Sequence, residues 1–271
     1  MKHRKITNSA IDICILTGCA IPPEIFEKCI NAVVREAPEN SQVYVFRNGN
    51  VPETRQEYDR IVATIPGVRE KHSVEDLGYP MGANRIMKSG TSPLILFVSD
   101  DVILHEGAVS KLMERMKDED IAICGLKLLF PEDSPDKGRP AGRVQHIGHG
   151  IDIRGEVTHP LLGWKPENPK CNVSRDVISV TGAAFIVRRS AFLKAGGFYE
   201  GYGRGYFEDV DLCLTFKSMG LRVFIDTEAV ATHYVGATFA VKKTTVPIDQ
   251  NRMILRQRKG HLLEHTSWSF W

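Results

Sequence analysis

Two clusters of carboxylates are the residues of this 271-residue chain whose type and spacing best suit chemistry. Asp100 and Asp101 come directly after the apolar run 94–98. Glu208 and Asp209 follow a glycine-rich loop. Adjacent carboxylates at the end of a buried strand suit a hard divalent cation that also binds phosphate oxygens. The alternative is structural: a solvated turn for the first cluster, and an acidic first helical turn for the second.

Histidines offer a second kind of candidate. His233 follows a strand-like segment and a turn predicted over residues 227–232, and a lone histidine is more often structural than a ligand. His146 and His149 could chelate a metal only from a helix or a tight turn. The glycines beside them predict a strand or loop instead, so this pair is not expected to bind a metal. The Walker A, Gly-x-Ser-x-Gly and His-Glu-x-x-His motifs are absent from the sequence.

The elements that must position these residues alternate between strand and helix patterns. Apolar or alternating runs predict strands at residues 11–16, 42–46, 68–73, 94–98, 121–128, 177–187 and 221–226. Helices are predicted at residues 22–36, 53–64, 82–89, 106–117, 189–195 and 209–218. This alternation is typical of an α/β fold, a three-layer α/β/α sandwich around a mostly parallel, mixed central sheet. The Gly-, Pro- and charge-rich residues 131–176 are interpreted as an active-site insertion containing a hairpin.

The order of the motifs is more specific than any one of them. The strand ending in Asp-Asp is followed by the insertion, Val-Thr-Gly-Ala-Ala-Phe-Ile-Val-Arg-Arg (180–189), Ala-Gly-Gly-Phe-Tyr-Glu (195–200), Glu-Asp-Val-Asp-Leu (208–212), Gly-Leu-Arg-Val (220–223) and His233. Within the insertion stand Val-Gln-His-Ile-Gly (144–148) and Thr-His-Pro (158–160). Over residues 10–240 this series resembles the inverting family 2 glycosyltransferases of the GT-A fold, particularly bacterial rhamnosyl- and galactofuranosyl-transferase-like members.

The resemblance implies a metal site and a general base. Asp101 matches the metal-binding last residue of the family's Asp-x-Asp motif, and His233 matches the histidine that completes the site for Mn²⁺ or Mg²⁺. Asp209 stands in the place of the general base, with Glu208 beside it as the second catalytic carboxylate. The implied reaction is inverting transfer of a hexosyl or deoxyhexosyl group from a nucleoside-diphosphate-sugar to an acceptor hydroxyl. The implied acceptor is a glycan or lipid-linked glycan of polysaccharide biosynthesis.

The resemblance also implies residues that contact the nucleotide-sugar: Thr17, Asn48, Asp76, Asn84, Asp100 and Gly182. The sequence departs from the family pattern at two places. Ser99 occupies the first place of the Asp-x-Asp motif, so the usual ribose contact falls to Asp100 or is absent. Arg47 or Asn48 occupies the place of the aspartate that usually reads the nucleotide base.

Bulk composition narrows the class of protein. A net charge of +2, with 25% charged residues, argues against a dedicated nucleic-acid-binding protein. No run approaches the about 18 apolar residues of a membrane span, and the first residues lack a signal-peptide pattern. The six cysteines show no Cys-x-x-Cys spacing, which favours a reducing, cytoplasmic setting.

The last residues, 241–271, are expected to form a basic helical tail after a catalytic domain at residues 1–240. This helix either packs back on the domain, which is the favoured alternative, or makes peripheral contact with an anionic membrane surface. Two other functions are open alternatives: a non-catalytic sugar-nucleotide or glycan-binding module, and a nucleotidylyltransferase. The latter usually carries a glycine-rich basic loop after the first strand, and residues 17–22 contain no Lys or Arg.

Overall fold

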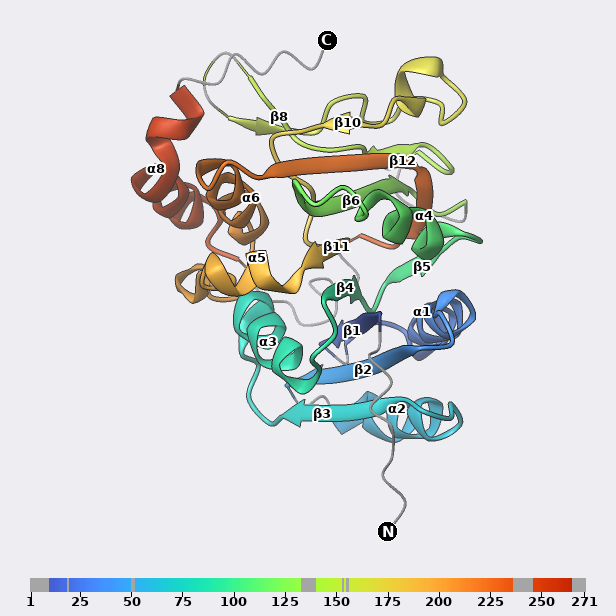
Figure 1. The fold of residues 1–271 in the computed structure, drawn as a ribbon. Helices are drawn as coiled ribbons and strands as arrows, with labels where there is room; N and C mark the ends of the chain where they lie inside the picture. The colour runs from blue at the N-terminus through green and yellow to red at the C-terminus, as the bar shows by residue number, and fades with distance from the viewer. Residues whose placement is uncertain are drawn as a thin grey trace.

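The computed structural model describes residues 10–18, 20–49, 52–132, 140–152, 154, 156–235 and 246–264. A central sheet crosses the molecule in the order β10-β12-β6-β11-β4-β1-β2-β3 (Figure 1). These strands are β1 (Ile11–Thr17), β2 (Ser41–Asn48), β3 (Arg69–Ser73), β4 (Leu94–Ser99), β6 (Ile121–Leu129), β10 (Arg175–Asp176), β11 (Ala184–Arg188) and β12 (Arg222–His233). The apolar runs that predicted β1, β4 and β6 are buried along nearly their whole length.

The directions of the strands confirm the predicted mixed sheet. β3, β2, β1 and β4 are parallel, and β11 lies antiparallel between β4 and β6. β6 and β12 are parallel, whereas β5 (Val102–Leu104) and β7 (Val144–His146) add antiparallel pairings to β12 and β6. The hairpin expected in the insertion is formed by β8 (Gly150–Ile151) and β9 (Val157–Thr158).

Helices cover both faces of the sheet, which confirms the three predicted layers (Figure 1). One face carries α1 (Pro23–Glu36), α2 (Pro52–Ala63) and α4 (Ala108–Arg115), and the other carries α3 (Gly78–Ile86), α5 (Arg189–Lys194) and α6 (Glu208–Ser218). The alternation of β1 shows why both faces need cover. Ile13 and Ile15 enter the first core, and Cys14 and Leu16 enter the second.

Outside the insertion, three strands differ from the prediction. The strand expected at 177–187 is shorter, because β11 begins only at Ala184. β12 continues through the turn expected at 227–232, with a register shift between Asp226 and Val230 that absorbs the irregular residues. β5 was not predicted, since three residues are too few to show a pattern.

The tail contains α8 (Ile248–Glu264), which packs on α6. Leu255 and Leu263 are buried together with Val210 and Leu214 of α6. Asn251 donates from Nδ2 to the main-chain oxygens of Tyr202 (2.9 Å) and Gly205 (2.7 Å).

The basic residues of α8 are engaged by the domain. Arg252 and Arg256 pair with Glu156, and Arg258 and Lys259 pair with Asp211. This agrees with the packed alternative for residues 246–264, whereas residues 241–245 and 265–271 lie outside the described residues. Among the helices that the structure describes, none is long and apolar enough to cross a membrane.

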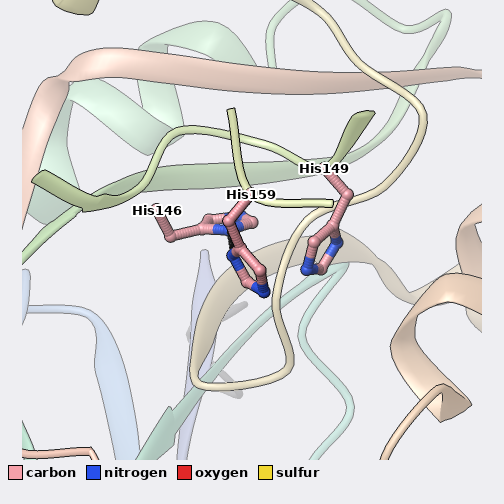
Figure 2. A group of neighbouring side chains, drawn as sticks. All are labelled: His146, His149 and His159. Atoms are coloured by element: carbon pink, nitrogen blue, oxygen red, sulfur yellow. Dashed lines mark hydrogen bonds between the residues drawn. The ribbon is translucent and has the colours of Figure 1, made fainter. Parts of the chain in front are cut away.

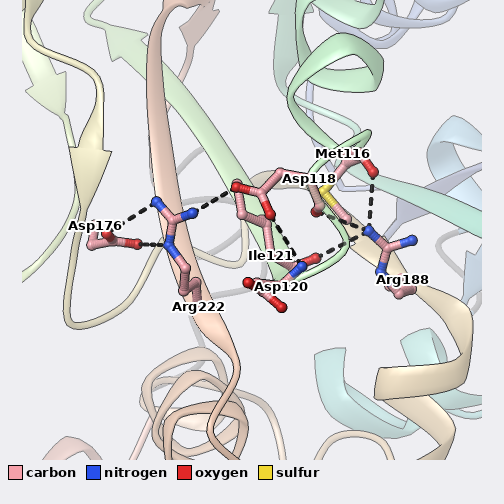
Figure 3. Close-up of polar contacts among 7 residues, drawn as sticks. All are labelled: Met116, Asp118, Asp120, Ile121, Asp176, Arg188 and Arg222. Atoms are coloured by element: carbon pink, nitrogen blue, oxygen red, sulfur yellow. Dashed lines mark hydrogen bonds and ion pairs between the residues drawn. The ribbon is translucent and has the colours of Figure 1, made fainter.

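Ion pairs and carbonyl contacts tie the sheet together at the end where β6 and β12 begin (Figure 3). Arg222 pairs with Asp176 of β10 and with Asp118 in the loop before β6. Arg188, the last residue of β11, donates to the main-chain oxygens of Met116 (3.0 Å) and Asp118 (3.1 Å). These ties lie at the opposite ends of the strands from the acidic clusters.

Candidate active site

Asp101 and His233 lie side by side at the carboxyl edge of the sheet. The pairing of β5 with the end of β12 sets His233 opposite Val102. Next to this pair, the main-chain N–H of Tyr234 donates to the main-chain oxygen of Asp101 at 3.0 Å. The Nε2 atom of His233 is 3.3 Å from Oδ1 of Asp101. The strand that the sequence did not reveal, β5, therefore brings together the two residues proposed as metal ligands.

Gln145 of β7 holds the His233 ring. Its Nε2 donates to the main-chain oxygen of His233 at 3.1 Å, and its Oε1 is 2.6 Å from Nδ1 of the ring. A carbonyl oxygen can only accept, so the first contact fixes which end of the amide is nitrogen. Oε1 can then only accept from Nδ1, which must carry a proton.

The tautomer leaves the other ring nitrogen as an acceptor. In the neutral imidazole only one nitrogen carries a proton, so Nε2 of His233 presents a lone pair to the Asp101 carboxylate. Two electron-rich groups 3.3 Å apart repel each other unless a cation or a proton lies between them. A nitrogen and a carboxylate oriented by an outer hydrogen bond form a donor set suited to a divalent metal.

Residues 179–183 connect this edge to the second acidic cluster. The N–H of Gly182 donates to Oδ2 of Asp209 at 2.7 Å, and the Tyr79 hydroxyl donates to the Gly182 oxygen at 2.5 Å. The N–H of Ser99 donates to the Ala183 oxygen at 2.8 Å. Asp209 is thus tied through two consecutive residues to the end of β4, beside Asp100 and Asp101.

Glu208 and Asp209 form a desolvated carboxyl pair at the start of α6. They follow Tyr206 (φ 74°) and Phe207 (φ 73°), two non-glycine residues in the left-handed region, a strained conformation that is often stored at functional sites. Glu208 is 6% exposed, and among the described residues its Oε2 has no hydrogen-bond partner. A bound ligand is one way to satisfy such an atom.

Burial changes the proton affinity of both carboxyl groups. It raises the pKa of Glu208 well above its usual range, and the neighbouring Asp209 adds to this effect. Burial also raises the pKa of Asp209, although the N–H groups of Gly182 and Val210 oppose it. Like-charged neighbours in a desolvated site share a proton at moderate pH, and such pairs serve as bases in enzymes.

Three histidines of the insertion converge (Figure 2). His149 contacts Ser179, and His146 contacts Thr181. Ring centroids are 4.6 Å apart for His146 and His149, and also for His149 and His159. The loop expected around Gly148 is present, and it brings His146 and His149 close to His159, although the sequence did not favour the pair as metal ligands. Gly148 has a φ of 95°, and a Cβ there would collide with Val177. Because glycine has no side chain, the loop can turn tightly at this position. Burial lowers the pKa of His146 and of His149 well below the usual range, which keeps these two rings neutral.

Comparison with known proteins identifies the family. Residues 18–194, more than half of the chain, match the family described as glycosyl transferase family 2. The chain belongs to glycosyl transferase family 2.

Two curated relatives share part of this family 2 chain. O-antigen biosynthesis protein RfbC of Myxococcus xanthus is 30% identical over 168 residues, which are 59% of this chain and 12% of that protein. Uncharacterized protein y4gI of Sinorhizobium fredii (strain NBRC 101917 / NGR234) is 24% identical over 187 residues, 67% of this chain and 20% of that protein. The match therefore covers a small part of the length of these relatives.

Solved structures share the fold. GalNAc-T7, crystallised with UDP, GalNAc and Mn²⁺, superposes with a TM-score of 0.65 at 11% identity, over 84% of this chain and 44% of that chain. The mannosyltransferase PcManGT from Pyrobaculum calidifontis, in complex with GDP-Man and Mn²⁺, gives 0.60 at 11% identity, over 95% and 71%. The expected GT-A type of three-layer sandwich is confirmed.

Two of the residues predicted to contact the donor lie at strand ends beside the loop after β1 of this family 2 chain. Thr17 is buried at the end of β1, and Asp100 is buried at the end of β4. The N–H of Gly18 donates to Oδ2 of Asp100 at 3.2 Å, and the N–H of Asp100 donates to the Leu16 oxygen at 3.1 Å. Asp100 thus shapes the β1 loop at the sheet edge where ligands of open α/β folds bind.

Asn48 and Asp76 hold the turn that begins α3. Asn48 accepts from the Leu77 N–H and donates to the Gly78 oxygen, both at 2.9 Å, and Asp76 accepts from the Gly78 N–H at 3.0 Å. Gly78 has a φ of 74°, and a Cβ there would lie 2.0 Å from the main-chain oxygen of Gly203. This contact packs the turn against the loop that leads to Glu208.

Two polar residues near the predicted donor site make contacts within the protein. Both amide atoms of Asn84 bond the Phe198 main chain, at 2.8 and 2.9 Å, so Asn84 joins α3 to the segment after α5 and its polar atoms are used there. Arg47 pairs with Asp59 of α2 and Glu70 of β3, so its guanidinium is held by acidic side chains of the domain. No role was predicted for Gln145, although it stands in the Val-Gln-His-Ile-Gly motif, because its contact with His233 joins residues far apart in the sequence.

Proposed function

We propose that the chain is a metal-dependent, inverting glycosyltransferase that moves a hexosyl or deoxyhexosyl group from a nucleoside-diphosphate-sugar to an acceptor hydroxyl. The observation that carries the proposal is the position of His233, whose Nε2 lies 3.3 Å from Oδ1 of Asp101 while Gln145 holds Nδ1 of the ring. Membership of glycosyl transferase family 2 and the GT-A fold support the reaction class.

The residues at this edge fit a divalent cation. Asp101 and His233 would hold Mn²⁺ or Mg²⁺ together with donor phosphates, since these ions accept carboxylate and phosphate oxygens and Mn²⁺ also accepts imidazole. When bound, the ion would neutralise the charge that develops on the departing diphosphate. The structures of GalNAc-T7 and PcManGT were obtained with Mn²⁺, which supports a metal without choosing between the two ions.

Asp209 takes the proton from the acceptor hydroxyl as its oxygen attacks the anomeric carbon. Oδ2 accepts from the Gly182 N–H and Oδ1 from the Val210 N–H, so the carboxylate is held in one orientation. Each oxygen retains a second lone pair that can accept the hydroxyl proton. A single displacement with one base inverts the anomeric centre.

The acceptor is a glycan or lipid-linked glycan. This part of the proposal rests on the relative from Myxococcus xanthus, whose name refers to O-antigen biosynthesis. The insertion would form the acceptor side, because its histidines contact residues 179–181 next to Asp209.

The test measures thermal unfolding with UDP, GDP, dTDP and CDP, each with and without Mn²⁺. A nucleotide at about 100 times its dissociation constant stabilises the fold by about 2.7 kcal/mol, which raises the melting temperature by about 5–10 °C for a chain of this size. We expect one nucleotide to act only with Mn²⁺ and the Asp101→Asn variant to lose that effect. If no nucleotide stabilises the wild type in either condition, the proposal is wrong.

A second candidate is a non-catalytic sugar-nucleotide-binding module, favoured by Ser99 in place of the first aspartate of the Asp-x-Asp motif. Both candidates predict nucleotide binding, so the distinction requires turnover. The nucleotide-sugar that corresponds to the stabilising nucleotide is incubated with the chain, and release of nucleoside diphosphate is measured. An enzyme of this class hydrolyses its donor slowly without acceptor, whereas a binding module releases nothing above the Asp209→Asn control.

A further inference from the structure

We propose that His146, His149 and His159 form a second metal site, which takes a borderline divalent cation of the Zn²⁺ class. Their candidate ligand atoms lie within 4.8 Å of one another (Figure 2). The site is separate from the Asp101–His233 pair and does not depend on the proposed transferase activity. Three imidazoles favour Zn²⁺, Co²⁺, Ni²⁺ or Cu²⁺ over the hard cations that suit carboxylates and phosphates.

The spacing of the rings suits one shared ion. The Nδ1 atoms of His146 and His159 are 3.3 Å apart. Two nitrogen ligands at about 2.0–2.1 Å from a tetrahedral Zn²⁺ are about 3.3–3.4 Å from each other. The third nitrogen, from His149, lies within 4.8 Å of the other two and needs to approach by up to about 1.4 Å to complete that geometry.

Outer contacts orient the rings from the protein side. The Nδ1 atom of His149 is 2.7 Å from the Ser179 hydroxyl, which leaves Nε2 of His149 for the cluster. A hydroxyl or carbonyl on the far nitrogen is the usual outer partner of a metal-bound histidine. His146 and His149 are buried, whereas His159 is exposed. The ion would therefore have three protein ligands and a fourth position open to water or to an oxygen of a ligand.

One existing hydrogen bond must change when the ion binds. The N–H of Thr181 donates to Nε2 of His146 at 3.1 Å, so in the metal-free form Nδ1 of His146 carries the proton and donates it to His159. A cation takes the place of that proton, and the proton of the neutral ring moves to Nε2, from which the Thr181 amide must turn away. The loss of one hydrogen bond weakens binding by about tenfold, which a three-imidazole site can tolerate.

The ion would join the insertion to the reacting edge. His146 ends β7, His149 precedes β8 and His159 follows β9, so the three ligands come from separate parts of residues 131–176. Ser179 would still contact His149, and Gly182 would still contact Asp209, so residues 179–183 would be held from both sides. The site would stabilise the wall on which the acceptor is proposed to bind.

The experiment measures Zn²⁺ binding to the full, untagged chain after dialysis against a chelator. Affinity and stoichiometry come from competition with a chromophoric chelator, and Co²⁺ substitution reports tetrahedral nitrogen coordination by visible absorption. We expect one Zn²⁺ per chain in the wild type and in Asp101→Asn. We expect His159→Gln to bind at least about 100-fold more weakly, and Ser179→Ala, which removes an outer partner, about 10–100-fold more weakly.

The control is His72→Gln, which removes an exposed histidine of β3 and should bind Zn²⁺ as the wild type does. Melting temperatures without metal verify that each variant folds, and the exposed position of His159 makes its substitution the least disruptive. Equal binding by His159→Gln and the wild type would overturn the proposal. So would the absence of micromolar binding in the wild type, or loss of Zn²⁺ binding in Asp101→Asn alone, which would assign the ion to the Asp101–His233 pair.

Discussion

Gln145 contacts His233 through both atoms of its amide, with Oε1 2.6 Å from ring Nδ1 and Nε2 3.1 Å from the main-chain oxygen. The two residues are distant in sequence, and β7 and β12 bring them together on either side of β6. The amide makes Nε2 of His233 a lone-pair donor, so the chemistry of the ring is set by a residue that bears no charge.

Replacing Gln145 should impair metal binding without touching a proposed ligand. Gln145→Leu removes the acceptor for Nδ1, so either tautomer becomes available and metal affinity should fall by about 10–100-fold. Gln145→Glu keeps an acceptor and should retain more of the affinity. Mn²⁺ binding is measured by electron paramagnetic resonance with the nucleotide that stabilises the chain. Equal affinity in Gln145→Leu and the wild type would contradict the role given to this contact.

Asp209→Asn should reduce turnover by about 10²–10⁴-fold and leave nucleotide binding intact, since general-base catalysis contributes about that much. Single-turnover transfer and nucleotide-dependent melting shifts are measured on the same preparation. Both Asp209 oxygens accept backbone N–H groups. In the asparagine variant one of these N–H groups therefore faces the side-chain NH₂, which is also a donor. The melting temperature must therefore be compared with that of the wild type. Wild-type turnover in a folded variant would remove Asp209 from the reaction.

The buried Glu208 should make stability depend on pH. Its pKa in the folded chain is well above the value of about 4.3 in an unfolded chain, so the folded state binds the proton more tightly. The stabilisation from this proton is fully present below about pH 4.3 and is lost as pH rises through the folded pKa. Glu208→Gln stays neutral, so its melting temperature should gain on that of the wild type between pH 4 and pH 8. A difference that stays constant over this range would show that Glu208 titrates normally.

Gly78 and Gly67 form a matched pair for testing the contact between the α3 turn and the loop before Glu208. Both have a positive φ, but a Cβ at Gly78 would lie 2.0 Å from the Gly203 oxygen, whereas nothing lies within 4 Å of one at Gly67. Gly67→Ala should cost about 1 kcal/mol from backbone strain alone. Gly78→Ala should cost about 1–3 kcal/mol more, because the loop must move. Urea unfolding measures both, and equal losses would mean that the contact is not tight.

The sheet could be predicted largely from sequence because its central strands are continuous apolar runs. Residues 94–98 and 121–128 are buried on both faces, so their composition alone marks them as strands. β5 could not be predicted in this way, since it has three residues and pairs with a strand far along the chain. The proximity of Asp101 and His233 depends on that pairing, and only the motif resemblance indicated it.

The site could be predicted from the sequence only in part, for the same reason. Asn84 was assigned only from a motif of the family, and the sequence does not show that its amide bonds the Phe198 main chain, a contact between segments that lie 114 residues apart. The three histidines meet only because Gly148 turns the chain and β9 returns His159 to the same place. Local periodicity carries no information about such contacts, whereas it does predict which face of a strand is buried.

Asn251 gives the last described helix an influence on the carboxylates proposed to react. By donating to the oxygens of Tyr202 and Gly205, it holds the loop whose strained residues aim Glu208 and Asp209. A protein truncated after residue 240 would keep every group proposed to react and lose the support that aims two of them. The smallest working unit is therefore longer than the part that carries the chemistry, and any fusion or domain exchange should carry residues 248–264 along.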